Sequence, residues 1–352
     1  MSISTNCIEE GVMVVIPVFN CKNYISDAVS SIKKQPYKKI FIILVDDGST
    51  DGSLEICTEW ASKDDRILTL HQKNQGSGSA RNSGIEAARG KYIYFFDVDD
   101  EIDENLLSYN VEVIEQQKVD MIIFGYTNVE QKYNSETVVS FPEIKINSND
   151  DLKRVYVDLC VLKVNGFAWN KFYRKSFLDN NNLRFENQRI QQDEVFNLKV
   201  YKYLEKGFVS SKILYTYYVY DKGNTRSRFI PDRFDICKSV REHFENLRTF
   251  WNLKDSRFES YLNKRFYTGV MSCLLFNLTH PQCQWTKKQK QWEMKRIMGD
   301  RLTKLAFDYA EKEEPSFEQK LYRKACRDES LLEIIVYTRL FRLFRYLYRK
   351  II

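Results

Sequence analysis

The first 125 residues alternate short apolar runs with amphipathic helical patterns, and this alternation limits the fold more than any other feature of the chain. The apolar runs have the length of buried strands and lie at 12–16, 40–45, 67–70 and 92–96. Between them, apolar residues recur at helical spacing, as they do over 25–32. Buried strands joined by helices predict an α/β fold with a doubly wound, mostly parallel sheet.

Polar clusters follow these strands at the points where each one ends. They are Phe19-Asn20, Asp46-Asp47, residues 75–78 and residues 97–100. Ligands of such sheets bind at the carboxyl ends of the strands, so we expect these clusters to converge on one site. The polar segment 130–150 predicts a loop region, and beyond Pro231 only helical patterns occur.

Composition excludes several classes of protein. No apolar run approaches the ~20 residues of a membrane-spanning helix, and the N-terminus has no secretory signal pattern. The eight cysteines are scattered without a Cys-x-x-Cys pair, which favours reduced thiols in a cytosolic protein. Of the net charge of +6, all lies in 320–352, where nine Lys and Arg face three acids. Because the rest of the chain is neutral, a nucleic-acid partner is not expected.

The segment Asp97-Val98-Asp99 places two carboxylates on one side of a strand end. Hard cations such as Mg²⁺ or Mn²⁺ take oxygen ligands of this kind. A solvated acidic turn is the alternative for an isolated Asp-x-Asp, and the position after a buried strand favours the metal site.

Two further features predict a nucleotide site. Asp47 can accept a hydrogen bond from N3–H of uracil, a donor that cytosine lacks, although a helix-capping role is the alternative. Phe19 can stack on the base or belong to the core. The segment 76–81 departs from a dinucleotide fingerprint because Arg81 replaces its third glycine, and we expect a flexible loop with Arg81 facing the nucleotide.

Together and in order, these motifs resemble those of inverting glycosyltransferases of family two, which have the GT-A fold. The motifs are Ile16 to Asn20, Val45 to Asp51, Asn74 to Asn82 with Gly84, Gly90 to Ile93, and Asp97 to Asp100. The resemblance covers about residues 11–220. The segment Gly166 to Arg174 also resembles the acceptor-side segment of bacterial capsule and O-antigen enzymes of this family.

The resemblance implies an organisation and a set of roles. A GT-A catalytic domain would span 1–225, with a nucleotide-sugar half at 11–125 and an acceptor half at 126–225, and a helical region would span 226–352. Nucleotide-sugar contacts would come from Pro17, Phe19, Asp47, Arg81 and Asp97; metal contacts from Asp99 and Asp97; acceptor-side contacts from Trp169 and Lys171. Asp193 would be the catalytic base.

Gln192-Asp193-Glu194 stands where the family commonly has Glu-Asp, so Glu194 remains the alternative base, and a helix start rich in acids is a third reading. The implied reaction moves one hexosyl or N-acetylhexosaminyl unit from a UDP-sugar to a glycan acceptor, with Mn²⁺ or Mg²⁺ as cofactor. A nucleotidyltransferase and a non-catalytic nucleotide-sugar-binding module are the other classes that these motifs allow.

The tail 331–352 predicts a basic amphipathic helix. Its basic arc comprises Arg339, Arg342, Arg345, Arg349 and Lys350, opposite a face rich in Leu, Phe and Tyr. Such a helix suits the inner surface of the cell membrane, where a polyprenyl-diphosphate-linked glycan acceptor for capsule or O-antigen synthesis would be held. A helix packed on its own domain, or on a second subunit of a homo-oligomer, is the alternative.

Overall fold

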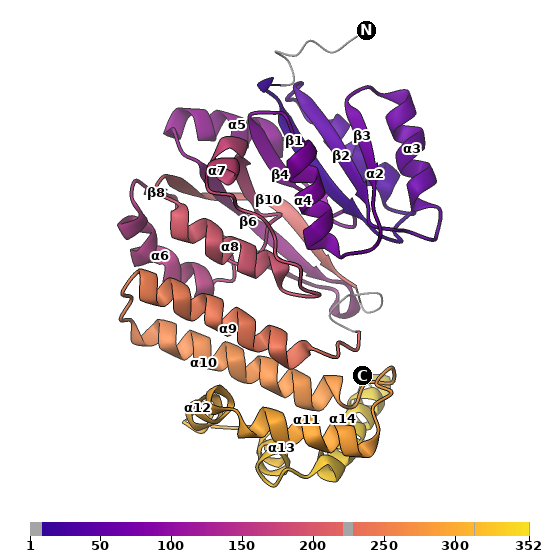
Figure 1. The fold of residues 1–352 in the computed structure, drawn as a ribbon, viewed down its shortest axis with the longest axis vertical. Helices are drawn as coiled ribbons and strands as arrows, with labels where there is room; N and C mark the ends of the chain where they lie inside the picture. The colour runs from indigo at the N-terminus through magenta and orange to yellow at the C-terminus, as the bar shows by residue number, and fades with distance from the viewer. Residues whose placement is uncertain (1–8, 221–227, 313, 352) are drawn as a thin grey trace. The chain divides into compact units, whose positions relative to one another are not determined.

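The computed structural model describes residues 9–220, 228–312 and 314–351, with the backbone alone for 342–351. The chain forms two compact units, Met1–Gly223 and Asn224–Ile352. The first unit is a mixed α/β unit around one sheet, and the second is helical (Figure 1). The predicted fold class is confirmed, whereas the catalytic roles given to the segments stay predictions at this point.

The sheet of the first unit has the strand order β3-β2-β1-β4-β9-β6-β10-β5, with β7 paired to β6 and β8 to β10. The four N-terminal strands of this order run parallel to one another, as the apolar runs predict. The strands are β1 (Val12–Val18), β2 (Ile40–Asp46), β3 (Ile67–His71), β4 (Tyr92–Phe95), β5 (Glu101–Ile102), β6 (Met121–Glu130), β7 (Ser135–Val139), β8 (Ile144–Ile146), β9 (Lys171–Arg174) and β10 (Gly207–Val219).

The second half of the sheet departs from the parallel arrangement. Strand β9 lies antiparallel between β4 and β6, so the direction of the chain reverses in the middle of the sheet. The loop predicted for 130–150 is wrong: β7 and β8 occupy much of it. Strand β7 pairs with β6 while nearly all of its side chains are exposed, which explains why its sequence is polar and has the composition of a loop.

In the described part of the first unit, seven helices connect these strands. They are α2 (Ile25–Lys33), α3 (Ser53–Lys63), α4 (Ser77–Ala87), α5 (Leu106–Gln117), α6 (Asn149–Val161), α7 (Lys175–Asn180) and α8 (Gln192–Tyr203). The helical face predicted over 25–32 is confirmed, because Ile25, Ala28, Val29 and Ile32 are the buried residues of α2.

Helix α4 lies unusually close to β1 because it carries a glycine at the contact. A Cβ atom built on Gly84 would stand 2.2 Å from Cγ1 of Val15, a buried residue in the middle of β1. No larger side chain fits there without moving the helix or the strand. Gly84 therefore fixes the distance between α4 and the sheet.

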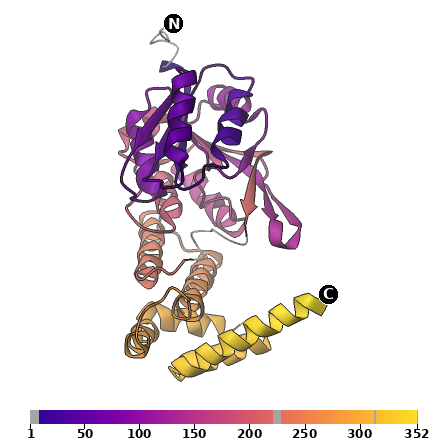
Figure 2. The same cartoon turned by 90° about the vertical axis from the view of Figure 1, so that its right-hand side faces the viewer.

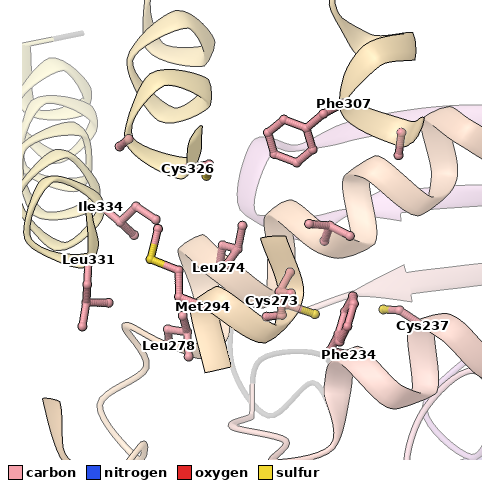
Figure 3. Packing of buried hydrophobic residues seen from close by; sticks show 14 of the residues in the cluster. Phe234, Cys237, Cys273, Leu274, Leu278, Met294, Phe307, Cys326, Leu331 and Ile334 are labelled. Carbon is pink, nitrogen blue, oxygen red and sulfur yellow. The ribbon is translucent and has the colours of Figure 1, made fainter. Parts of the chain in front are cut away.

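The second unit consists of α9 (Arg233–Phe250), α10 (Ser256–Met271), a π-helical segment Ser272–Asn277, α11 (Lys287–Gly299), α12 (Arg301–Ala310), α13 (Phe317–Arg327) and α14 (Leu331–Ile351). Its core is a cluster that includes Leu274, Met294 and Phe307, and the first turn of α14 contributes Leu331 and Ile334 (Figure 3). The C-terminal helix α14 is the long yellow helix of Figure 2.

None of the helices in the described ranges is both long and apolar enough to cross a bilayer.

We predict that Gly84→Ala lowers the free energy of unfolding by about 1–3 kcal/mol, because the added methyl group overpacks the contact with Val15. Chemical denaturation followed by circular dichroism measures this. Adding Val15→Ala should restore part of the loss, since it removes the two atoms nearest the new methyl group. Gly166→Ala is the matched control, because the nearest atom to its Cβ is 4.0 Å away. Equal effects of the two glycine variants would contradict the close packing.

Candidate active site

The loops that follow β1 and β2 are joined at the carboxyl edge of the sheet. Asn20, which has a positive φ of 50°, donates its backbone N–H to Ser49 Oγ at 3.0 Å. Its side-chain Oδ1 accepts from the backbone N–H of Thr50 at 2.8 Å. Asparagine adopts this left-handed backbone more readily than most residues. The predicted convergence of these two clusters is confirmed.

Asp47 is 3% exposed and organises the loop that follows β3. Its Oδ1 accepts from Gln72 Nε2 at 2.8 Å and from the backbone N–H of Gln75 at 2.9 Å. Its Oδ2 accepts from the backbone N–H of Gly76 at 2.7 Å. A carboxylate has room for about four donors, so one position on Oδ2 remains for a ligand. Phe19, 38% exposed, follows β1, in which Pro17 lies opposite Val45.

Arg81 is the centre of the site. Its guanidinium donates through Nη2 to Asp97 Oδ1 at 2.6 Å and through Nη1 to Asp193 Oδ1 at 2.7 Å. The side chain is 3% exposed and lies over the ring of Phe185, at 5.4 Å from its centroid. One guanidinium thus holds together two carboxylates that are 96 positions apart in the chain (97 and 193).

The segment that carries Arg81 differs from the expected flexible loop. Residues 77–80 form the first turn of α4, and Gly76 precedes it with a positive φ of 90°. A Cβ on Gly78 would stand 3.1 Å from Gln192 Cγ, and Gln192 Nε2 donates to Ser77 Oγ. Gly78 thus allows the first turns of α4 and α8 to pack closely, and Arg81 faces two acids. The prediction of a flexible loop here is wrong.

Asp97 and Asp99 are suited to a divalent cation. Burial, and then repulsion by Asp97, raise the pKa of Asp99 to about 6, although its side chain reaches solvent. Among the described residues, no side chain other than Arg81 donates a hydrogen bond to either carboxylate. A cation would remove the repulsion between them. No group of three His, Cys or acidic side chains in the described ranges forms a complete metal site, so the remaining ligands would be oxygens of a substrate or water.

Asp100 has a different role, which the sequence patterns did not reveal. Its Oδ2 accepts from Tyr215 Oη at 2.6 Å and its Oδ1 from the backbone N–H of Tyr218 at 2.9 Å. Burial, followed by repulsion from Asp97 and Asp99, raises its pKa well above the ordinary value. Tyr220 Oη also donates to the backbone carbonyl of Asp99 at 3.1 Å. Strand β10 therefore fixes the acidic turn, and the Tyr-rich composition of β10 was the only signal of this.

Asp193 and Glu194 lie in the first turn of α8 and differ in their surroundings. The side chain of Asp193 is 21% exposed and pairs with Arg81, which also pairs with Asp97. The Cγ atom of Glu194 lies 4.0 Å from the Cβ position of Gly166, on the segment before β9. Asp193 thus belongs to the Arg81 network.

Trp169 and Lys171 do not face solvent as the acceptor-side prediction requires. Trp169 stacks on Tyr215, with centroids 4.3 Å apart, and is buried. Lys171 is fully buried, and its Nζ donates to the carbonyls of Val164 at 3.1 Å and Phe167. Burial lowers its pKa well below the ordinary value. Both side chains support the sheet and the 164–170 segment from inside, so direct contact with an acceptor does not follow from this geometry.

The sheet of the first unit, with the acidic turn at its carboxyl edge, has the GT-A fold of glycosyltransferases. Solved structures with this fold include S. aureus TarS 1-349 in complex with UDP-GlcNAc, at TM-score 0.62 and 18% identity, covering 95% of this chain and 92% of TarS 1-349. Residues 13–181 match the family described as glycosyl transferase family 2, and the chain belongs to this family.

Named relatives agree with this assignment. The uncharacterized glycosyltransferase EpsJ of Bacillus subtilis is 32% identical over 250 residues, which cover 68% of this chain and 70% of EpsJ. The glycosyltransferase GlyA of Streptococcus pneumoniae is 32% identical over 221 residues, 60% of this chain and 31% of GlyA. The chain is a glycosyltransferase, and the open alternatives of a nucleotidyltransferase and a non-catalytic binding module are set aside.

We predict that Tyr215→Phe lowers the free energy of unfolding by about 1–3 kcal/mol, because it leaves Oδ2 of buried Asp100 without its donor. Urea denaturation of the full chain measures the effect. Tyr94→Phe is the matched control: Tyr94 is equally buried, but its hydroxyl has no hydrogen-bond partner among the described residues. The control should be as stable as the wild type or slightly more stable. A larger loss in Tyr94→Phe than in Tyr215→Phe would contradict the assigned role of Asp100.

Proposed function

We propose that this glycosyltransferase moves one sugar from a UDP-sugar to a glycan acceptor with inversion at the anomeric carbon. The acceptor is a polyprenyl-diphosphate-linked glycan in bacterial surface polysaccharide synthesis. The observation that carries the proposal is the bridge by Arg81, which brings Asp97 of the acidic turn beside Asp193 of α8. A metal-binding acid and a base are both needed at one reacting sugar, and this bridge supports their presence in one site.

The donor is assigned to the edge formed by the β1 and β2 loops. Asp47 keeps one acceptor position for N3–H of uracil, and Phe19 is exposed enough to stack on the base. Pro17 lies near the end of β1, opposite Val45 of β2 and just before Phe19. The fold relative TarS was crystallised with UDP-GlcNAc and with UDP, which supports this class of donor. The transferred unit is a hexosyl or an N-acetylhexosaminyl group.

Asp99 and Asp97 are the residues that would hold Mn²⁺ or Mg²⁺, with Asp99 as the more direct ligand because Asp97 is already paired with Arg81. When bound, such an ion neutralises the charge that develops on the departing UDP. Arg81 adds a fixed positive charge beside Asp97. Because Arg81 is buried, it acts on the nucleotide site by holding Asp97 in position rather than by direct contact. Asp100 keeps the turn in place through Tyr215.

Asp193 is the proposed base. A sugar hydroxyl is a weak nucleophile, and a positioned carboxylate takes its proton as the oxygen attacks the anomeric carbon. Arg81 Nη1 donates to Asp193 Oδ1 at 2.7 Å and so holds this carboxylate in place at the start of α8. A single in-line displacement follows, because UDP is already an activated leaving group. No covalent sugar–enzyme intermediate is required.

The acceptor is assigned to the inner face of the cell membrane through α14, with the enzyme in the cytoplasm. In its described part, Leu331 and Ile334 are buried in the core of the second unit, while Leu332, Val336 and Leu340 are exposed. The first half of the tail is therefore part of the fold, as the alternative interpretation states. Arg342, Arg345, Arg349 and Lys350 lie outside the residues whose side chains the structure describes, so the basic arc stays a prediction.

Substitution of Asp193 tests the base. We expect Asp193→Asn to lower kcat for transfer by about 10²–10⁴-fold, because the amide cannot accept the proton. Its oxygen can still accept from Arg81, so the Kd for UDP-sugar should change little. Glu194→Gln is the matched control and should retain activity. Transfer can be followed by UDP release, with the anomeric configuration of the product read by NMR. Wild-type turnover in Asp193→Asn with loss in Glu194→Gln would move the role to Glu194.

Chelation and Asp99→Asn test the metal site. Transfer should stop after exhaustive chelation and return on addition of Mn²⁺ or Mg²⁺. Asp99→Asn should raise the Mn²⁺ concentration for half-maximal activity by roughly tenfold or more. Asp103→Asn, an exposed acid that follows the same turn, should not change it. Full activity in the chelated enzyme would refute the metal requirement.

A further inference from the structure

We propose that the outer face of α11 binds anionic phospholipid headgroups and is a second membrane contact of the helical unit. We call this surface the α11 face and define it by Lys288, Trp292 and Lys295. It deepens the proposed action at the membrane surface and rests on that part of the proposed function. The sequence analysis did not predict the α11 face, because the composition of α11 by itself is not that of an interfacial helix.

The three residues lie on one side of the helix. They are spaced i, i+4 and i+7, which at 3.6 residues per turn places them within an arc of about 60°. The side turned to the core carries Glu293, Met294 and Ile297, all of them buried. Trp292 is 65% exposed although the core face of its helix is fully packed. A large aromatic side chain is therefore presented outward between two lysines.

The charge on this face is uncompensated. Lys287, Lys288, Lys290 and Lys295 form no ion pair with any described residue. The acid of this helix, Glu293, points inward and pairs with Arg296 at 2.7 Å. Lys304 on α12 differs, because it lines a hollow of 280 Å³ together with Asp308 and Glu311. Arg296, which lies over the ring of Trp292 at 5.9 Å from its centroid, is neutralised by Glu293 and Asp235. Within the described ranges, the lysines of α11 are not paired in this way, and their positive charge complements an anionic surface.

The buried side of α11, opposite the α11 face, packs in the same core cluster as α14. Met294 and Ile297 of α11 and Leu331 and Ile334 of α14 are members of one core (Figure 3). Gln291 Nε2 also donates to the backbone carbonyl of Glu329, just before α14, at 2.9 Å. The two helices are thus neighbours within one unit, and each exposes apolar side chains that this unit does not cover.

A lipid surface fits these residues better than a rigid polyanion does. An indole has an apolar body and a single N–H donor, which suits the boundary between headgroups and acyl chains. Lysines on either side extend toward phosphate groups while their alkyl chains lie along the apolar layer. The α11 face thus combines basic and aromatic side chains, as interfacial helices do over a longer surface.

Vesicle flotation of the full chain tests the proposal. Vesicles of phosphatidylcholine with phosphatidylglycerol are compared with vesicles of phosphatidylcholine alone. We expect Lys288→Gln with Lys295→Gln to weaken binding to the anionic vesicles by about 30-fold, because each lysine near such a surface contributes roughly a factor of five. Trp292→Ala should weaken it as well. The matched control is Lys304→Gln with Lys312→Gln, two exposed lysines outside the face, and it should change binding less than about threefold.

The outcomes separate this inference from the proposed function. If the wild type floats and the α11 variants float equally well, or lose no more than the control, the α11 face is refuted while membrane action through α14 stands. If the wild type itself does not bind anionic vesicles, the membrane part of the proposed function fails and the inference falls with it. UDP-sugar turnover and transfer to a water-soluble acceptor should be unchanged in the α11 variants, which shows that they are folded.

Discussion

The site depends on one buried guanidinium placed between two carboxylates. A charge that leaves water is stabilised only when it is paired and hydrogen-bonded, and Arg81 meets this condition through Asp97 and Asp193 together. Removal of one member of a buried pair typically costs about 3–5 kcal/mol, because the remaining charge stays buried. The arrangement therefore fixes the acidic turn after β4 and the first turn of α8 with respect to each other before any substrate binds.

Close packing of small residues makes this pairing possible. Gly84 lets α4 approach β1, and Gly78 lets the start of α4 approach the start of α8. A larger residue at either position would move Arg81 away from one of its partners. Hydrogen bonds over long sequence distances then fix the rest: Asp47 holds the loop after β3, and Asp100 holds the acidic turn against β10. The carboxylates of the proposed site are thus held by a network of hydrogen bonds and close helix packing.

The parts of this framework differ in how well the sequence predicts them. Apolar strands and the buried face of α2 follow from local periodicity, because burial on a sheet or helix repeats over a few residues. The acidic turn and Asp193 follow from motifs. The direction of β9 and the Tyr215–Asp100 bond do not, since each depends on residues more than 40 positions apart. The same holds for the position of Lys171 inside the sheet, where it lies opposite Ile123 of β6. Strand β7 was missed for a different reason: its side chains are exposed, so it has no apolar pattern to detect.

In the helical unit, the last helix, α14, has one face in the core and another face exposed. Leu331 and Ile334 are needed by the core, whereas Leu332, Val336 and Leu340 on the other side of α14 are not covered by that unit. A helix that is anchored on one face can present its other face at a fixed orientation, which a free amphipathic tail cannot do. Because α14 is already ordered by folding, its conformational entropy is not lost again when this face and the α11 face bind lipid. Membrane binding by this helix would then cost less ordering entropy than binding by an unfolded tail of the same composition.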